Sequence, residues 1–90
     1  MTKQFNSIWD AIEDDPVKQG NLKLRSQLMI EINTRLEQED KRQSEIAEQL
    51  QTTQPRVSAL HKGKINDFRL DTLIDFATRL GLKVSIDVAA

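Results

Sequence analysis

The segment from Gln43 to Gly63 constrains the fold of this chain more than any other part of the sequence. It contains two stretches of about two helical turns, each with one apolar face, separated only by Gln51 and Thr52. Thr53 is suited to cap the second stretch, because its hydroxyl can accept a hydrogen bond from a free N–H of the first turn. The apolar positions are Ile46, Ala47, Leu50, Val57 and Leu60. Two short helices with so short a link must cross over a shared core, so the segment predicts a helix-turn-helix.

A helix-turn-helix places the N-terminal turn of its second helix in the major groove of DNA. At that turn, the Gln54 amide can read adenine bidentately, and the Arg56 guanidinium can read O6 and N7 of guanine. Pro55 and Ala59 are predicted to contact a thymine methyl group. The residues predicted to lie near DNA phosphates are Arg42, Gln43, Thr53, Ser58, Lys62 and Lys64. Two alternatives stay open: Arg56 as an exposed ion-pairing residue, and Ser58 as a hydroxyl that packs the motif without touching DNA.

The charge of the chain is unevenly distributed along the sequence. The formal net charge is −1, which taken alone argues against a nucleic-acid partner. Residues 41–64, however, carry five basic and two acidic side chains, and no acidic residue occurs from Thr53 to Lys64. Because screening limits exposed charges to a range of about 10 Å, the local sign matters more than the total. The pattern predicts modest non-specific affinity for DNA and a reliance on two copies; a merely solvated basic face is the alternative.

The remaining sequence predicts further helices around this motif. Residues 5–12 form one apolar helical stripe that ends before Pro16, and a break over residues 17–21 follows, with Asn21 as the next cap. A helix over 22–39 is then expected, and another over 70–80 that stops at Gly81. The residues expected on the inward face of the longer helix are Leu24, Leu28, Met29, Ile32 and Leu36. The predicted fold is mostly α, a compact domain of about five helices.

The C-terminal sequence changes period from helical to alternating. The apolar residues Leu82, Val84, Ile86 and Val88 alternate with polar ones, which is typical of a half-buried β-strand. Because a single strand leaves its backbone groups unpaired, we expect it to pair antiparallel with its own copy in a homodimer; a frayed tail is the alternative. The predicted organisation is an N-terminal arm over 1–20, a helix-turn-helix domain over 21–81 with its motif at 43–63, and a dimerisation strand over 82–90.

The motif resembles the helix-turn-helix proteins of the Cro/lambda-repressor type, also called the XRE family. The residues that carry the resemblance are Gln43, Ala47, Leu50, Thr53, Val57, Ser58, Leu60 and Gly63. Two positions depart from the family pattern. Gln51 stands where a glycine is usual, and a left-handed residue there would carry a small strain. Arg42 stands where a Ser or Thr cap is usual, which weakens the cap but adds a cation near an expected phosphate.

Nearly the whole chain is also similar to HigA-type antitoxins of type II toxin–antitoxin systems. The stretches that carry this likeness are 14–17, 21–29, 53–58 and 67–73. The resemblance implies a repressor that binds a palindromic operator in its own promoter as a dimer and neutralises a RelE/HigB-like mRNA-cleaving toxin. A stand-alone XRE-type regulator and a protein-interaction module are the alternatives.

The N-terminal stripe fits such a partner. Its apolar residues, the candidate toxin contacts, are Phe5, Ile8, Trp9 and Ile12. They are interspersed with acidic residues, and an apolar and acidic helix suits a groove on a basic, RNA-binding protein. The alternative is that the stripe packs as core against the protein's own dimer.

Several classes of function are not expected. The chain has no cysteine and a single histidine, His61, so we expect no metal site, no cofactor and no catalytic constellation, and therefore no enzyme. The absence of cysteine and of an apolar N-terminal run leads us to expect a cytoplasmic protein without a membrane partner.

Overall fold

The computed structural model describes residues 15–90, and this part of the chain is helical apart from its links and its C-terminal segment. Its elements are α2 (Pro16–Glu39), α3 (Gln43–Leu50), α4 (Gln54–His61), the 3-10 helix η1 (Ile65–Asp67) and α5 (Leu70–Arg79). The expectation of a mostly α domain is confirmed. The predicted first helix and the stripe of Phe5, Ile8, Trp9 and Ile12 lie outside the described residues.

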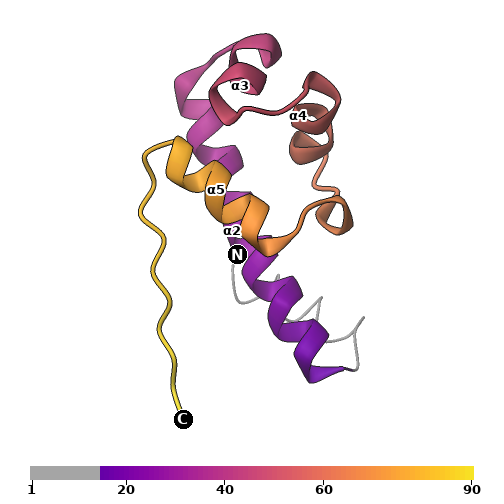
Figure 1. The fold of residues 1–90 in the computed structure, drawn as a ribbon, viewed down its shortest axis with the longest axis vertical. Helices are drawn as coiled ribbons and strands as arrows, with labels where there is room; N and C mark the ends of the chain where they lie inside the picture. Colours follow the sequence, from indigo (N-terminus) through magenta and orange to yellow (C-terminus); the bar gives the residue numbers. More distant parts are fainter. Residues whose placement is uncertain (1–14) are drawn as a thin grey trace.

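Helix α2, with 24 residues, is the longest of the described helices and contacts most of the other elements. Figure 1 shows α5 along the middle of α2, α3 and α4 toward one end of it, and the last residues as an extended segment that runs down the left side of the view. Helix α2 contacts α5, η1 and α4, while α3 packs mainly on α4. None of the described helices is long and apolar enough to cross a membrane.

The predicted start of α2 is wrong. The helix begins at Pro16 rather than after a break, and the side chain of Asp15 caps it by accepting from the N–H of Val17 at 2.9 Å. Pro16 occupies the first helical position, where a proline starts a helix as readily as it ends one. Gly20 and Asn21 therefore lie within the helix rather than in a break.

The inward face of α2 also differs from the prediction. Leu24 is 42% exposed and Leu28 only partly buried, whereas Ile32 and Leu36 lie in the core. A strict four-residue spacing drifts by about 40° per step around a helix of 3.6 residues per turn, so the two ends of the row face different directions. The buried residues of α2 are Leu22, Ser26, Met29, Ile32 and Leu36.

The core gathers the inward faces of all five elements. Leu50, Val57 and Leu60 of the helix-turn-helix are no more than 1% exposed, as the sequence pattern predicts. Phe68, which follows η1, is equally buried and meets Phe76 of α5 edge to face, with ring centroids 6.1 Å apart. One aromatic pair thus joins the turn after α4 to α5.

The C-terminal segment, residues 82–90, is extended and forms no β-strand in the described chain. Gly81, at φ 80°, ends α5, and the N–H of Leu82 donates back to the Ala77 carbonyl at 2.9 Å. Leu82 packs on the core, but Ile86 and Val88 are 67% and 85% exposed. A β-strand requires a neighbour for its backbone, so the predicted strand and its pairing across a dimer stay predictions.

Candidate nucleic-acid interface

The link between α3 and α4 fixes the angle at which α4 is presented. Gln51 adopts the left-handed conformation at φ 55° and ψ 49°, and its N–H donates to the Glu48 carbonyl at 3.2 Å. The next residue, Thr52, donates its N–H to the Ala47 carbonyl at 2.9 Å. These two bonds close α3 in the manner of a helix C-cap usually built on glycine. Strain was expected here if the residue that replaces the usual glycine were left-handed, and the conformation of Gln51 meets that condition.

The first turn of α4 is exposed to solvent on one face. Thr53 caps it, with its hydroxyl oxygen accepting from the N–H of Arg56 at 3.3 Å. Gln54 and Pro55 are exposed, whereas Val57 and Leu60 on the opposite face are fully buried. Ser58 and Ala59 are half-buried at the edge between the two faces. The structure thus brings an amide, a proline ring and a capped helix N-terminus together at one exposed end.

Cations follow α4 at its other end. Lys62 and Lys64 are exposed on either side of Gly63, which has φ 72°. Their backbones stay tied to the helix, because the N–H of Lys62 donates to the Ser58 carbonyl at 3.0 Å and that of Lys64 to the Ala59 carbonyl at 3.1 Å. The predicted phosphate-binding lysines are therefore held in a fixed relation to α4.

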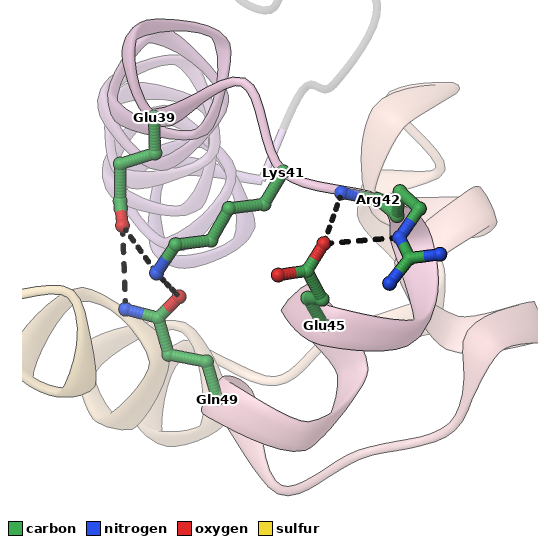
Figure 2. A network of polar contacts seen from close by, with 5 residues as sticks. All are labelled: Glu39, Lys41, Arg42, Glu45 and Gln49. Carbon is green, nitrogen blue, oxygen red and sulfur yellow. Dashed lines mark hydrogen bonds and ion pairs between the residues drawn. The ribbon is translucent and has the colours of Figure 1, made fainter.

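Arg42 precedes α3 and is engaged by Glu45 (Figure 2). The Glu45 carboxylate accepts from the backbone N–H of Arg42 at 3.3 Å and from its Nε at 3.2 Å. An arginine side chain has no acceptor, so only the glutamate half of a capping box is present. The hydrogen bond from the Arg42 side chain, followed by that from its backbone, lowers the pKa of Glu45 below its usual value. The Arg42 side chain stays 83% exposed, beside the helix-turn-helix, where a phosphate was predicted.

A second polar network, also in Figure 2, joins the end of α2 to α3. Lys41 Nζ lies 3.2 Å from a carboxylate oxygen of Glu39 and donates to the Gln49 side-chain oxygen at 3.1 Å. Gln49 closes the triangle by donating to Glu39 at 3.4 Å. The charge of Lys41 is thus compensated locally, so the excess of positive charge shifts toward α4 and the residues after it.

Arg56 lies closer to the protein than the sequence indicated. Its Nη1 donates to the Asp67 carbonyl at 2.9 Å, and its guanidinium carbon lies 4.4 Å from the centroid of the Phe68 ring. The side chain is half-buried rather than fully exposed. The prediction that it reads guanine stays a prediction.

Two residues of α2, which were not among the predicted site residues, bond to the end of α4 and to η1. The Asn33 side chain donates to the Leu60 carbonyl at 3.0 Å. Arg25 Nη1 donates to the carbonyls of Ile65 and Phe68 at 3.1 and 3.3 Å. These partners are 27 to 43 residues apart in the sequence, so no local pattern could connect them.

The described residues also bear on metal binding, which requires several ligating side chains close together. No group of three or more His, Asp or Glu side chains that could hold a metal ion occurs within residues 15–90. The exposed end of α4 and the lysines after it combine hydrogen-bonding side chains with positive charge, which is the combination that contacts to bases and phosphates require.

Comparison with known proteins agrees with this geometry. The sequence model of a family described as a helix-turn-helix domain matches residues 11–89 of the 90. Among curated proteins, no sequence matches the chain.

Proposed function

The chain belongs to this family of helix-turn-helix domains, and on that premise we propose that it is a sequence-specific transcriptional repressor that binds a palindromic operator as a homodimer. The observation that carries the proposal is the exposed first turn of α4, with Gln54 and Pro55 accessible and Val57 and Leu60 anchored behind them. A helix presented in this way offers its N-terminal side chains to base edges in the major groove.

The assignment of contacts follows from exposure and chemistry. Gln54, Pro55 and Ala59 are proposed to face bases, the amide reading adenine and the apolar groups meeting thymine methyls. The proposed phosphate contacts are Arg42, Gln43, Thr53, Ser58, Lys62 and Lys64. The absence of acidic residues from Thr53 to Lys64 supports this division, since a carboxylate beside a phosphate would repel it.

The second copy is proposed to dock on a groove between α2, α5 and the C-terminal segment. The groove has a volume of about 310 Å³, and its apolar lining includes Leu24, Leu28, Ile74, Leu82, Val84 and Ile86. The drift of the leucine row on α2 leaves Leu24 and Leu28 there instead of in the core. From Lys83 to Ala90 the backbone makes no hydrogen bond to any of the described residues, 15–90, and none of these residues covers its edge as a neighbouring strand would. Antiparallel pairing of two such segments would give their backbone N–H and C=O groups hydrogen-bond partners, and it would cover the grooves of both copies.

The DNA assignment is tested by substituting the proposed reader and a proposed phosphate contact separately. Gln54→Ala should lower affinity for the promoter site by about 1–3 kcal/mol and relax discrimination at one base pair, with non-specific binding unchanged. Lys62→Ala should weaken binding to all sequences alike and reduce the salt slope by about one. Unchanged affinity of Gln54→Ala for the promoter DNA, measured by gel shift, would contradict the assignment of α4 as the recognition helix.

We further propose that the repressor is the antitoxin of a toxin–antitoxin pair and acts in the cytoplasm. The support is the similarity to HigA-type antitoxins and the apolar, acidic pattern of residues 5–12. The test is coexpression with the product of the adjacent reading frame. Rescue of growth and co-purification are expected, and both should be lost with Trp9→Ala. Neither rescue nor co-purification with the wild-type chain would identify a stand-alone regulator instead.

A further inference from the structure

The turn after the recognition helix is held by two arginines from different helices. Arg25 of α2 donates to the carbonyls of Ile65 and Phe68, and Arg56 of α4 donates to the carbonyl of Asp67 between them. All three acceptors belong to η1 or the residue after it. A guanidinium is suited to this task because its several N–H groups have a fixed planar geometry.

Arg56 adds a second contact that Arg25 lacks. Its guanidinium lies over the face of Phe68, and that ring is only 1% exposed, so the stacked side of the cation is shielded from water. Cation–π attraction strengthens when it is desolvated in this way. The bond from Nη1 to the Asp67 carbonyl and the stacking on Phe68 together hold the guanidinium against the protein.

The turn that Arg56 holds is continuous with a proposed phosphate contact. The N–H of Lys64 donates to Ala59 of α4, and its carbonyl accepts from Asp67 of η1 at 3.1 Å. Lys64 is therefore attached on one side to the recognition helix and on the other to the turn that Arg56 fixes. Movement of η1 away from α4 would move the backbone of Lys64 with it.

Resting on the proposed DNA-binding function, we propose that Arg56 is a positioning residue of the DNA site. From its place in the first turn of α4, it locks η1 against the recognition helix through Phe68 and Asp67. It thereby keeps Lys64 in register with Gln54. Its contribution to DNA affinity passes through the protein and is the same for every base sequence.

The experiment measures affinity and salt slope for a set of operators, each with one base pair replaced, at a temperature where circular dichroism shows every variant folded. The variants are Arg56→Ala, Phe68→Leu and the double variant. Phe76→Leu is the matched control, because it removes an aromatic ring from the same pair without touching Arg56. Arg69→Ala controls for the loss of one positive charge nearby, since its exposed side chain pairs only weakly with Asp71 at 3.4 Å.

Arg56→Ala and Phe68→Leu should each weaken binding to all operators by a similar factor, on the order of 10-fold, which corresponds to about 1.4 kcal/mol. Both should lower the salt slope, and the double variant should be little worse than either single variant, as expected for residues that act through one contact. Phe76→Leu should retain the wild-type salt slope.

Two results would overturn the proposal. One is a loss confined to a single G·C base pair in Arg56→Ala, which would make Arg56 a base reader. The other is an effect of Phe68→Leu on DNA binding no larger than that of Phe76→Leu. If the wild-type chain bound no operator, the proposed function and the DNA role of Arg56 would both fail. In that case the contact between Arg56 and Phe68 would still be visible in thermal unfolding, where the double variant should lose less stability than the sum of the two single variants. Additive losses of stability would instead show that the contact itself is wrong.

Discussion

The helix-turn-helix of this chain buries its apolar side chains, whereas the C-terminal segment leaves most of its apolar side chains exposed. In α3 and α4, Leu50, Val57 and Leu60 are at most 1% exposed, and the N–H groups of Gln51 and Thr52 in the link between the helices donate to carbonyls of α3. In residues 82–90, Ile86 and Val88 are mostly exposed, and the backbone beyond Leu82 makes no hydrogen bond to residues 15–90. One region is complete in a single copy, and the other has the composition of an interface without its partner. The difference supports the proposal that folding and dimerisation rest on separate parts of the molecule. The first two of the following predictions test that separation, and the other two test the stability of the helix-turn-helix alone.

The largest effect is expected from deleting residues 84–90. Leu82 stays in place on the core, so the shortened chain should keep its helices but become monomeric. Loss of the second half-site should weaken operator binding on the order of 10²–10⁴-fold, because two linked binding events become one. Light scattering and gel shift measure the two changes. A shortened chain that is still dimeric would refute strand pairing, and one that is unfolded would refute the separation itself.

Leu60→Ala should be the most damaging single substitution in the helix-turn-helix. The side chain is fully buried, so its truncation should lower the free energy of unfolding by about 2–5 kcal/mol, measured by urea titration. Ile86→Ala is the matched control from the other region. It should leave the unfolding of the dilute monomer unchanged and shift only the concentration at which dimers form. Equal losses of monomer stability in the two variants would show that the C-terminal segment belongs to the core.

Two substitutions test the conformational strain at the left-handed residues before and after α4. Gln51→Gly should raise the free energy of unfolding by about 0.5–1 kcal/mol, because glycine adopts the left-handed conformation without the penalty of a side chain. Gly63→Ala should lower it by about 1 kcal/mol, since φ is 72° there although a Cβ would meet no atom within 4 Å. Thermal unfolding measures both changes. A lower melting temperature for Gln51→Gly would mean that the glutamine side chain contributes more than the backbone strain removes.

The smallest effect concerns the Arg42–Glu45 pair at the start of α3. Because the hydrogen bonds from Arg42 place the pKa of Glu45 below its ordinary value of 4.5 in the folded chain, the pair stabilises the fold above that pH. Its contribution is lost as the pH falls through the lowered folded pKa. Glu45→Gln should therefore melt slightly below the wild type at pH 7 and together with it at strongly acid pH. Glu48→Gln, on the same helix, is the matched control for the loss of one carboxylate.

Much of the candidate site could be predicted because its signals are local. A cap at Thr53, a proline in the first turn and apolar residues at helical spacing specify α4 within a few consecutive positions. At Gln51 the expectation came from the resemblance, which has a glycine at this position, and it held only if the residue were left-handed; the φ of 55° meets that condition. The same local reasoning failed at Pro16, because a proline is compatible with either end of a helix and only the Asp15 cap decides between them.

The sequence by itself determined the helical class, the helix-turn-helix and the exposed polar turn of α4, since each depends on residues within one or two turns of one another. Only the tertiary structure decided which side of α2 is buried, where the Arg56 guanidinium lies, and that Asn33 bonds to the end of α4 while Arg25 bonds to η1 and the residue after it. Those features depend on contacts between residues far apart in the chain. A polar side chain such as arginine has many conformations of similar energy. Its conformation in the folded protein is therefore selected by the carbonyl or aromatic ring that the fold places near it.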